Sequence, residues 1–269
     1  MWALVRPWRP GTRPLLADTP TRLLVAVACV VVAALVLASR TPLPTGAMRV
    51  VGVAAGHGAL LATALAWAGC VPGSGVVAIV LLAAAAAAAT LGPAGALAYL
   101  AVPLWVAWLA RRQRLVALGL AGPVPRRALL AAVVLGAFLG GHLLVSASLT
   151  LGVHIRPVGG AGVLAALAYD AGANVLAAEC LFRGALFNRA QRRWSFATAL
   201  ALSTAAYVAR YLVDPLLPKS VEWVVGAVFY LTLLSAGNCW LFWWSGSLVP
   251  GVVSALVFFA AYRLLGTGG

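Results

Sequence analysis

An acidic and a basic residue stand four positions apart inside an apolar stretch of the chain. Glu179 and Arg183 are separated by Cys-Leu-Phe, and residues four apart on a helix lie on the same face. An ionisable side chain at membrane depth costs at least a few kcal/mol, so such residues usually have both a partner and a function. The pair is therefore the first candidate for a reaction site or for a buried ion pair.

Further polar residues occur in the same region. Asp170 and Asn174 are also four positions apart, so we expect them to share one helix face. The nine-residue step from Asp170 to Glu179 is about two and a half α-helical turns, which predicts the two carboxylates on opposite sides of the helix. Arg210 lies within the next apolar run and requires an anion, with Glu179 as its first expected partner and Asp170 as its second. The alternative for Arg210 is a purely structural ion pair that fixes how two helices dock.

The composition places these residues in a membrane protein. The chain is 64% hydrophobic and only 9% charged, with a mean hydropathy of +1.02, whereas a soluble domain carries about 25% charged residues. We therefore predict an all-α fold, a polytopic membrane helix bundle. Its formal net charge is +14, but the arginines form clusters between apolar runs, at 6–22, 111–127 and 189–193. This pattern is typical of cytoplasmic loops, with anionic lipid as a further possible ligand, and argues against nucleic-acid binding.

Nine apolar runs are candidates for crossing the membrane, which needs about 20 residues. They are 23–39, 50–70, 75–91, 94–110, 128–151, 162–188, 196–213, 223–244 and 247–265. The stretch 75–110 is one tilted helix or a hairpin broken at Leu91-Gly92-Pro93. The break is favoured because it places all three arginine clusters on one side, together with a cytoplasmic N-terminus.

The same pattern divides the chain into three parts. We predict a basic interfacial arm over 1–22, an N-terminal group of transmembrane helices over 23–127 and a helix bundle carrying the candidate site over 128–269. Only one of the 19 basic residues is lysine, a bias that suggests a GC-rich bacterium, so the expected location is the bacterial inner membrane.

The charged pair also lies in a recognisable motif. Glu179-Cys-Leu-Phe-Arg183-Gly184, followed by an apolar run and then Gly246-Ser-Leu-Val-Pro250, resembles the CPBP family, also called the CAAX protease and bacteriocin-processing or Abi family. The resemblance covers roughly residues 165–262. It implies a glutamate-type intramembrane protease whose pattern is EExxxR, then FxxxH, then HxxxN or HxxxD. In such a site a glutamate and a histidine polarise water, while a second histidine and an amide or carboxyl group stabilise the oxyanion.

The chain departs from this pattern where the chemistry needs it most. The first glutamate is replaced by Ala178, and the family's phenylalanine and first histidine correspond to Tyr207 and Tyr211. With Pro250 as the anchor, the second histidine corresponds to Ser254 and the asparagine or aspartate to Phe258; alignment on Gly-Ser-Leu instead moves the histidine position to Ala255. Loss of a general base or of an oxyanion donor typically lowers the rate by about two to four orders of magnitude.

We therefore expect a non-catalytic protein in which Glu179 and Arg183 are vestigial or structural. Their candidate ion-pair or cavity partners are Arg210, Tyr207, Tyr211, Ser254, Asp170 and Asn174. Its expected role is that of a scaffold, binding protein or accessory subunit, with membrane lipids and other membrane proteins as partners and with no cofactor or metal. The alternative is an active intramembrane protease that uses Glu179 with help from Tyr211, Ser254 or a relocated histidine, His57 or His142.

Overall fold

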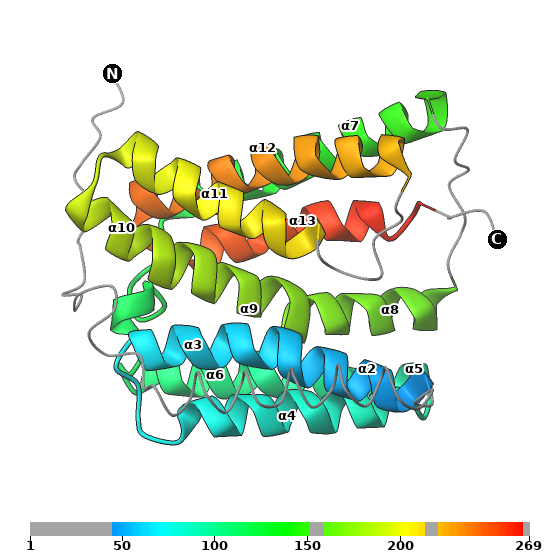
Figure 1. Ribbon diagram of the computed structural model, residues 1–269, viewed down its shortest axis with the longest axis horizontal. Coiled ribbons are helices and arrows are strands. Elements are labelled where there is room, and N and C mark those ends of the chain that lie inside the picture. Colours follow the sequence, from blue (N-terminus) through cyan, green and yellow to red (C-terminus); the bar gives the residue numbers. More distant parts are fainter. Residues whose placement is uncertain (1–44, 151–158, 213–219, 266–269) are drawn as a thin grey trace. The chain divides into compact units, whose positions relative to one another are not determined.

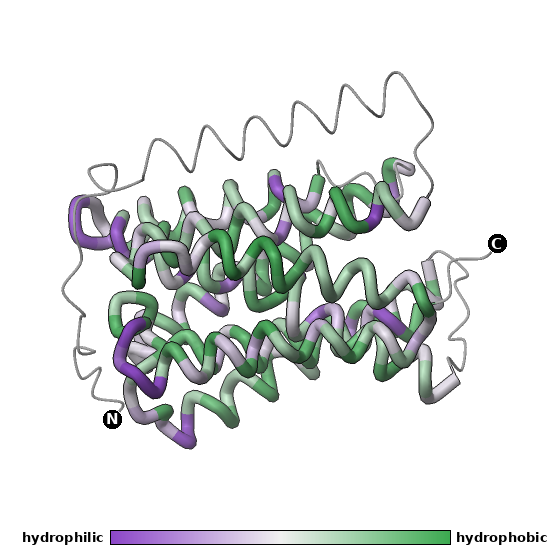
Figure 2. Tube along the Cα trace, turned by 90° about the horizontal axis from the view of Figure 1, so that it is seen from below, coloured by the Kyte–Doolittle hydropathy of each residue, from purple (hydrophilic) through white to green (hydrophobic). Residues whose placement is uncertain are grey.

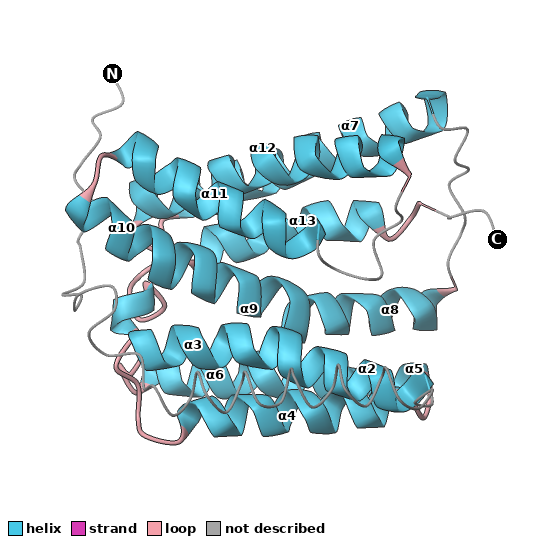
Figure 3. Ribbon diagram, in the orientation of Figure 1, coloured by secondary structure: helices cyan, strands magenta, loops and turns pink. Residues whose placement is uncertain are grey.

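The computed structural model describes residues 45–150, 159–212 and 220–265, and every regular element in these ranges is a helix (Figure 3). Five helical stretches are long and apolar enough to cross a membrane, at Thr45–Trp67, Pro93–Arg111, Arg126–Thr150, Gly160–Arg193 and Val221–Ser245. Two shorter helices, Ser74–Ala89 and Val249–Tyr262, are also apolar. The predicted all-α membrane helix bundle is confirmed, whereas the count of nine spans is not.

The predicted break after residue 91 is present. Helix α4 (Ser74–Ala89) ends in a turn, and α5 (Pro93–Ala96) begins directly after Gly92, whose φ of +129° suits glycine and few other residues. The chain then turns back, so that the following segments pack on α4. The approach is close at Gly95, where an added Cβ would lie 1.9 Å from the carbonyl oxygen of Ala88. The stretch 75–110 is thus a helical hairpin. The predicted arm at 1–22 and the first predicted span at 23–39 lie outside the described residues.

The described residues form two compact units, which we call the N-terminal unit (45–117 and 160–181) and the C-terminal unit (118–150, 182–212 and 220–265). Helix 160–193 passes from the first into the second. The predicted boundary between residues 127 and 128 is not tested by this grouping and stays a prediction.

The N-terminal unit is built from α2 (Thr45–Val53), α3 (Ala59–Trp67), α4, α5, η2 (Leu97–Leu100) and α6 (Ala101–Arg111), together with α8 (Gly160–Tyr169) and α9 (Val175–Glu179) (Figure 1). Helices α2 and α3 pack on α4, and α8 packs on α5 and η2. Glycine allows the closest approach, since a Cβ on Gly172 would lie 2.1 Å from the carbonyl oxygen of Tyr99. Small residues at such crossings are the usual basis of helix association in membranes.

The C-terminal unit consists of α7 (Arg126–Thr150), α10 (Asn188–Arg193), α11 (Phe196–Leu212), α12 (Val221–Ser245) and α13 (Val249–Tyr262). Local signals set the bounds of α12, because the side chain of Ser220 accepts a hydrogen bond from the backbone N–H of Trp223 and Gly246 ends the helix at φ +66°. Helix α13 packs against both α7 and α12, and α12 packs in addition against α7 and α11 (Figure 1).

The contact between α7 and α13 depends on a Gly-x-x-x-Gly pair. A Cβ on Gly136 would lie 2.4 Å from the carbonyl oxygen of Ser254, and one on Gly140 would lie 2.7 Å from the Cβ of Ala261. The two backbones therefore come into direct contact at these glycines. Such close packing increases the dispersion attraction between the helices, which matters in a membrane because lipid gives no hydrophobic driving force for helix association.

Hydropathy follows the arrangement of the helices. In Figure 2 the most hydrophilic turns, drawn in purple, stand at helix ends, whereas the helix bodies are mainly green. Large apolar side chains are also exposed on the outer faces of α7 and α12, including Leu130, Val134, Phe138, Val225 and Phe229. Such faces suit the acyl chains of a bilayer.

Candidate functional site

The helix that carries the predicted charged pair is not uniformly α-helical. Residues Asp170–Asn174 and Cys180–Phe187 are π-helical, with α9 between them. A π-turn accommodates one extra residue and is frequent at functional sites. Glu179 ends α9 and Arg183 lies in the second π-segment, and both side chains are fully buried. The predicted burial of these two charges in a membrane-spanning helix is thus present.

The first π-segment holds the other predicted polar pair. Asn174 donates a hydrogen bond from Nδ2 to Oδ1 of Asp170 over 3.1 Å, and both residues are buried, so the prediction that they share a face is confirmed. The predicted half-circle between Asp170 and Glu179 assumed an uninterrupted α-helix. Residues Asp170–Asn174 are π-helical instead, so the premise of that estimate does not hold, and the relative direction of the two carboxylates stays a prediction.

A histidine of the N-terminal unit lies beside this helix. His57, within the π-segment Ala54–Gly58, shares a 2.7 Å hydrogen bond between its Nε2 and the hydroxyl of Tyr169, whose ring packs edge-on against Tyr99. Tyr169 precedes Glu179 by ten residues, roughly 15 Å along a helix axis. His57 is therefore held at the level of Tyr169 rather than at that of Glu179.

Removing either partner of the His57–Tyr169 bond should have a small but measurable effect. Interhelical hydrogen bonds in membranes contribute on average about 0.6 kcal/mol and at most about 1.7 kcal/mol. In a double-mutant cycle of His57→Phe and Tyr169→Phe, followed by unfolding in detergent, we expect a coupling energy within this range. Strictly additive effects of the two substitutions would show that the bond does not contribute.

In the C-terminal unit, Arg183 packs on aromatic rings. Its guanidinium carbon lies 3.9 Å from the ring centroid of Tyr207, and the same ring meets Phe182 edge-on. A desolvated cation–π contact of this kind contributes about 2 kcal/mol. The hydroxyl of Ser203 donates to the carbonyl of Phe182 over 2.7 Å and so fixes α11 against this helix. Tyr207, at the family's phenylalanine position, thus serves as the platform for Arg183.

The positions of the missing histidine and amide are also occupied by packed rings. Tyr211 stacks on Phe259 with ring centroids 5.8 Å apart and an interplanar angle of 24°. Phe258 packs against Phe259 and Tyr230. All four side chains are at most 8% exposed. This aromatic cluster packs rings between α11, α12 and α13, and none of its four side chains is an imidazole or an amide.

Ser254 contributes a buried hydroxyl one turn before Phe258. Its side chain is fully buried, and its Oγ has no hydrogen-bond partner among the described residues. Nearby on α12, Asn238 donates from Nδ2 to the carbonyl of Gly251 over 3.1 Å. A serine hydroxyl needs an adjacent general base before it can act as a nucleophile, and no such base is hydrogen-bonded to Ser254 in the described part of the chain.

Arg210 is the remaining predicted candidate. Its guanidinium carbon lies 4.2 Å from the ring centroid of the adjacent Tyr211, and the residue is half-buried. The predicted pairing of Arg210 with Glu179 or Asp170 stays a prediction.

Two features of the C-terminal unit were not predicted. His142 on α7 shares a 2.8 Å hydrogen bond with the hydroxyl of Tyr230, which places this histidine on the outer side of the aromatic cluster. A buried chain of small polar groups also joins α11 to α12, since Ser235 donates to Thr204 and Cys239 to Ser203. The available sequence signal was the adjacent pair Ser203-Thr204 on α11 together with the four-residue spacing of Ser235 and Cys239 on α12.

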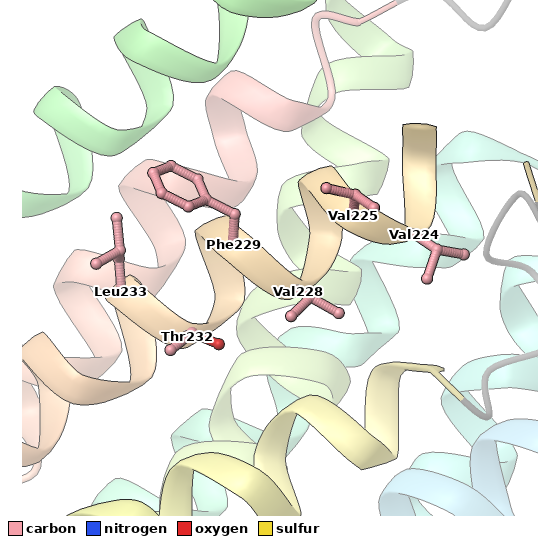
Figure 4. Close-up of a pocket in the computed structure, with 6 residues that line it drawn as sticks. All are labelled: Val224, Val225, Val228, Phe229, Thr232 and Leu233. Carbon is pink, nitrogen blue, oxygen red and sulfur yellow. The ribbon is translucent and has the colours of Figure 1, made fainter. Parts of the chain in front are cut away.

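One groove of about 440 Å³ lies on the outer face of α12 and carries no ionisable group. It is lined by Val224, Val225, Val228, Phe229, Thr232 and Leu233 (Figure 4). Figure 4 shows these side chains projecting from a single helix, so the groove suits an acyl chain or an apolar helix rather than a reaction. Across the described ranges, no group of three or more histidine, cysteine or acidic side chains is arranged to hold a metal ion.

Residues 160–258 match the family model of the type II CAAX prenyl endopeptidase Rce1-like proteins. The match includes Glu179, Arg183, Tyr211 and Ser254, and it confirms the predicted resemblance to the CPBP family over this part of the chain. No curated protein and no solved structure matches the chain.

Proposed function

Because residues 160–258 carry an Rce1-like region within a helical membrane protein, we propose that this chain is a non-catalytic relative of the CPBP proteases. In this proposal the former reaction centre has become a packing core, and the protein acts as a scaffold, binding protein or accessory subunit in a membrane complex. Its location is the bacterial inner membrane, with the N-terminus in the cytoplasm.

The observation that carries the proposal is the aromatic cluster. A glutamate-type protease needs an imidazole beside its carboxylate and a donor for the oxyanion. At the corresponding positions, Tyr211 is stacked on Phe259 and Phe258 is packed on Tyr230. These rings are buried and in mutual contact, so restoring water activation would require both new functional groups and space for a substrate. Arg183, which the family retains, is engaged with the ring of Tyr207.

The exposed apolar face of α12 supports a role in binding. Val225, Phe229 and Leu233 are each more than 40% exposed, and they line or border the groove of Figure 4. A transmembrane helix of another protein with small residues on one side would bury this face. Co-purification of a partner at fixed stoichiometry in mild detergent, lost in a Phe229→Ala/Leu233→Ala variant, is the expected result.

Purified protein should not cleave a prenylated CAAX peptide or a transmembrane peptide above the rate of its own Glu179→Gln variant. The reason is that Ala178, Tyr211 and Ser254 stand where the family has its first glutamate and its two histidines, and loss of a general base or of an oxyanion donor typically lowers the rate by about two to four orders of magnitude. Product formation is measured by mass spectrometry in detergent and again in lipid vesicles, with an active CPBP protease as the positive control. Cleavage that disappears in the Glu179→Gln variant would establish an active protease and overturn the proposal.

A further inference from the structure

We propose that one end of the C-terminal unit is a docking surface for anionic phospholipid headgroups. The surface consists of Arg126 and Arg127 at the start of α7, Arg192, Arg193 and Trp194 at the end of α10, and Trp240 and Trp244 near the end of α12. We call it the basic–tryptophan end. It goes beyond the proposed function, because it does not depend on whether the protein cleaves a substrate.

Contacts within the unit bring these segments to one end. The ring of Phe196, two residues after Trp194, packs against Trp243 with centroids 5.3 Å apart, which joins the end of α10 to the end of α12. The backbone N–H of Leu248 donates to the carbonyl of Gly119 over 3.0 Å, which joins the turn after α12 to the segment before α7.

The register of α7 and α13 gives the same placement. Gly136 lies beside Ser254 and Gly140 beside Phe258 and Ala261, so the two helices run in the same direction. Arg126 precedes Gly136 by ten residues of α7, roughly 15 Å, and Val249, the first residue of α13 after the turn from α12, precedes Ser254 by five residues, roughly 8 Å. The start of α7 and the end of α12 therefore lie at the same end of the unit.

The charge at this end is one-sided. Arg126, Arg127, Arg192 and Arg193 are all exposed. In the described part of the C-terminal unit the one acidic residue is Glu222, which stands at the opposite end of α12, roughly 35 Å away along a helix of 25 residues. No described acidic residue of the unit therefore lies at this end, and the ligand complementary to its positive charge is an anion.

The tryptophans indicate what kind of anion. Trp194 and Trp240 are 42% and 41% exposed, and Trp240 stacks on Trp244 with centroids 5.1 Å apart. Exposed tryptophan at the end of an apolar helix settles at the level of lipid headgroups. Arginines at that depth meet phosphates of the bilayer, and each contributes about 1 kcal/mol toward an anionic lipid surface. The surface thus fits an anionic phospholipid better than a soluble acidic molecule.

The test compares the binding of phosphatidylglycerol and phosphatidylcholine to the full-length protein in detergent, measured by native mass spectrometry. The variant Arg126→Gln/Arg127→Gln/Arg193→Gln should lose affinity for phosphatidylglycerol by about fivefold for each arginine, with little change for phosphatidylcholine. The matched variant with lysine at the same three positions keeps the charge and should keep most of the affinity. Higher ionic strength should weaken phosphatidylglycerol binding to the wild-type protein.

A second control separates position from net charge. Arg263→Gln removes a charge directly after α13, at the other end of that helix, and should leave phosphatidylglycerol binding unchanged. An equal loss in Arg263→Gln and in a single Arg193→Gln variant would overturn the proposal, because it would show a dependence on total charge alone. Unchanged phosphatidylglycerol affinity in the folded triple-glutamine variant would overturn it as well.

Discussion

A single methyl group at Gly136 should destabilise the protein strongly. The Cβ of a Gly136→Ala variant would lie 2.4 Å from the carbonyl oxygen of Ser254 and 2.8 Å from the Cβ of Val257. Backbone cannot yield as a flexible side chain can, so α7 and α13 must move apart. Overpacking of this kind typically costs about 1 to 3 kcal/mol and occasionally more. Here the loss should lie at or above the upper end, because moving α13 away from α7 also disturbs the packing of α13 on α12.

The natural control is five residues away on the same helix. Gly141 has no atom within 4 Å of an added Cβ, so Gly141→Ala makes the same chemical change without a clash. Since alanine favours helix over glycine by up to about 1 kcal/mol, this control should be neutral or stabilising. Thermal unfolding of both variants in detergent, followed by circular dichroism, gives the comparison. Equal stability of the two variants would contradict the close contact between α7 and α13.

Replacement of Arg183 by alanine should have the second large effect. Arg183 is a large side chain that is fully buried, with its guanidinium 3.9 Å from the ring centroid of Tyr207. Truncation of a long buried side chain costs about 2 to 5 kcal/mol through lost contacts and the cavity that remains, and loss of a desolvated cation–π contact contributes to that total. We expect a destabilisation of about 3 kcal/mol or more.

A variant of the partner residue identifies the source of this effect. Tyr207→Phe keeps the ring beneath the guanidinium and should cost less than about 1 kcal/mol, whereas Tyr207→Leu removes the ring and should cost more. Unfolding by a denaturing detergent, monitored by tryptophan fluorescence, measures all three substitutions. If Arg183→Ala is as stable as the wild-type protein, Arg183 has no structural role, and its retention must then be explained by binding or chemistry.

The helical architecture could be predicted because apolar runs and glycine–proline punctuation are local properties. The turn at Gly92-Pro93 is an example, since its positive φ and its proline at the start of α5 follow from residue type alone. The two compact units are different. Residues 160–181 group with 45–117, and nothing in the spacing of those residues indicates that partnership, because it arises from contacts such as Gly172 against Tyr99.

The candidate site was predicted in composition but not in packing. The buried pair Asp170 and Asn174 follows from a four-residue spacing, and their hydrogen bond confirms it. The stacking of Tyr211 on Phe259 joins two helices, and a single sequence contains no rule for which ring meets which. The π-turns escaped prediction for a similar reason, since helix propensity does not distinguish an α-turn from a π-turn.

The π-turn at residues 170–174 has a consequence for how this chain tolerates changes in length. Deletion of the single residue Ala171 would let the segment adopt ordinary α-helical hydrogen bonding, so that α8 and α9 would form one regular α-helix. Because the π-turn accommodates one residue more than an α-helical turn, the shortened helix would keep Glu179 at close to its present angle relative to α8, and its side chain would stay buried. The same one-residue deletion inside the regular α-helix α8 would instead rotate the residues that follow it by about 100° relative to those that precede it.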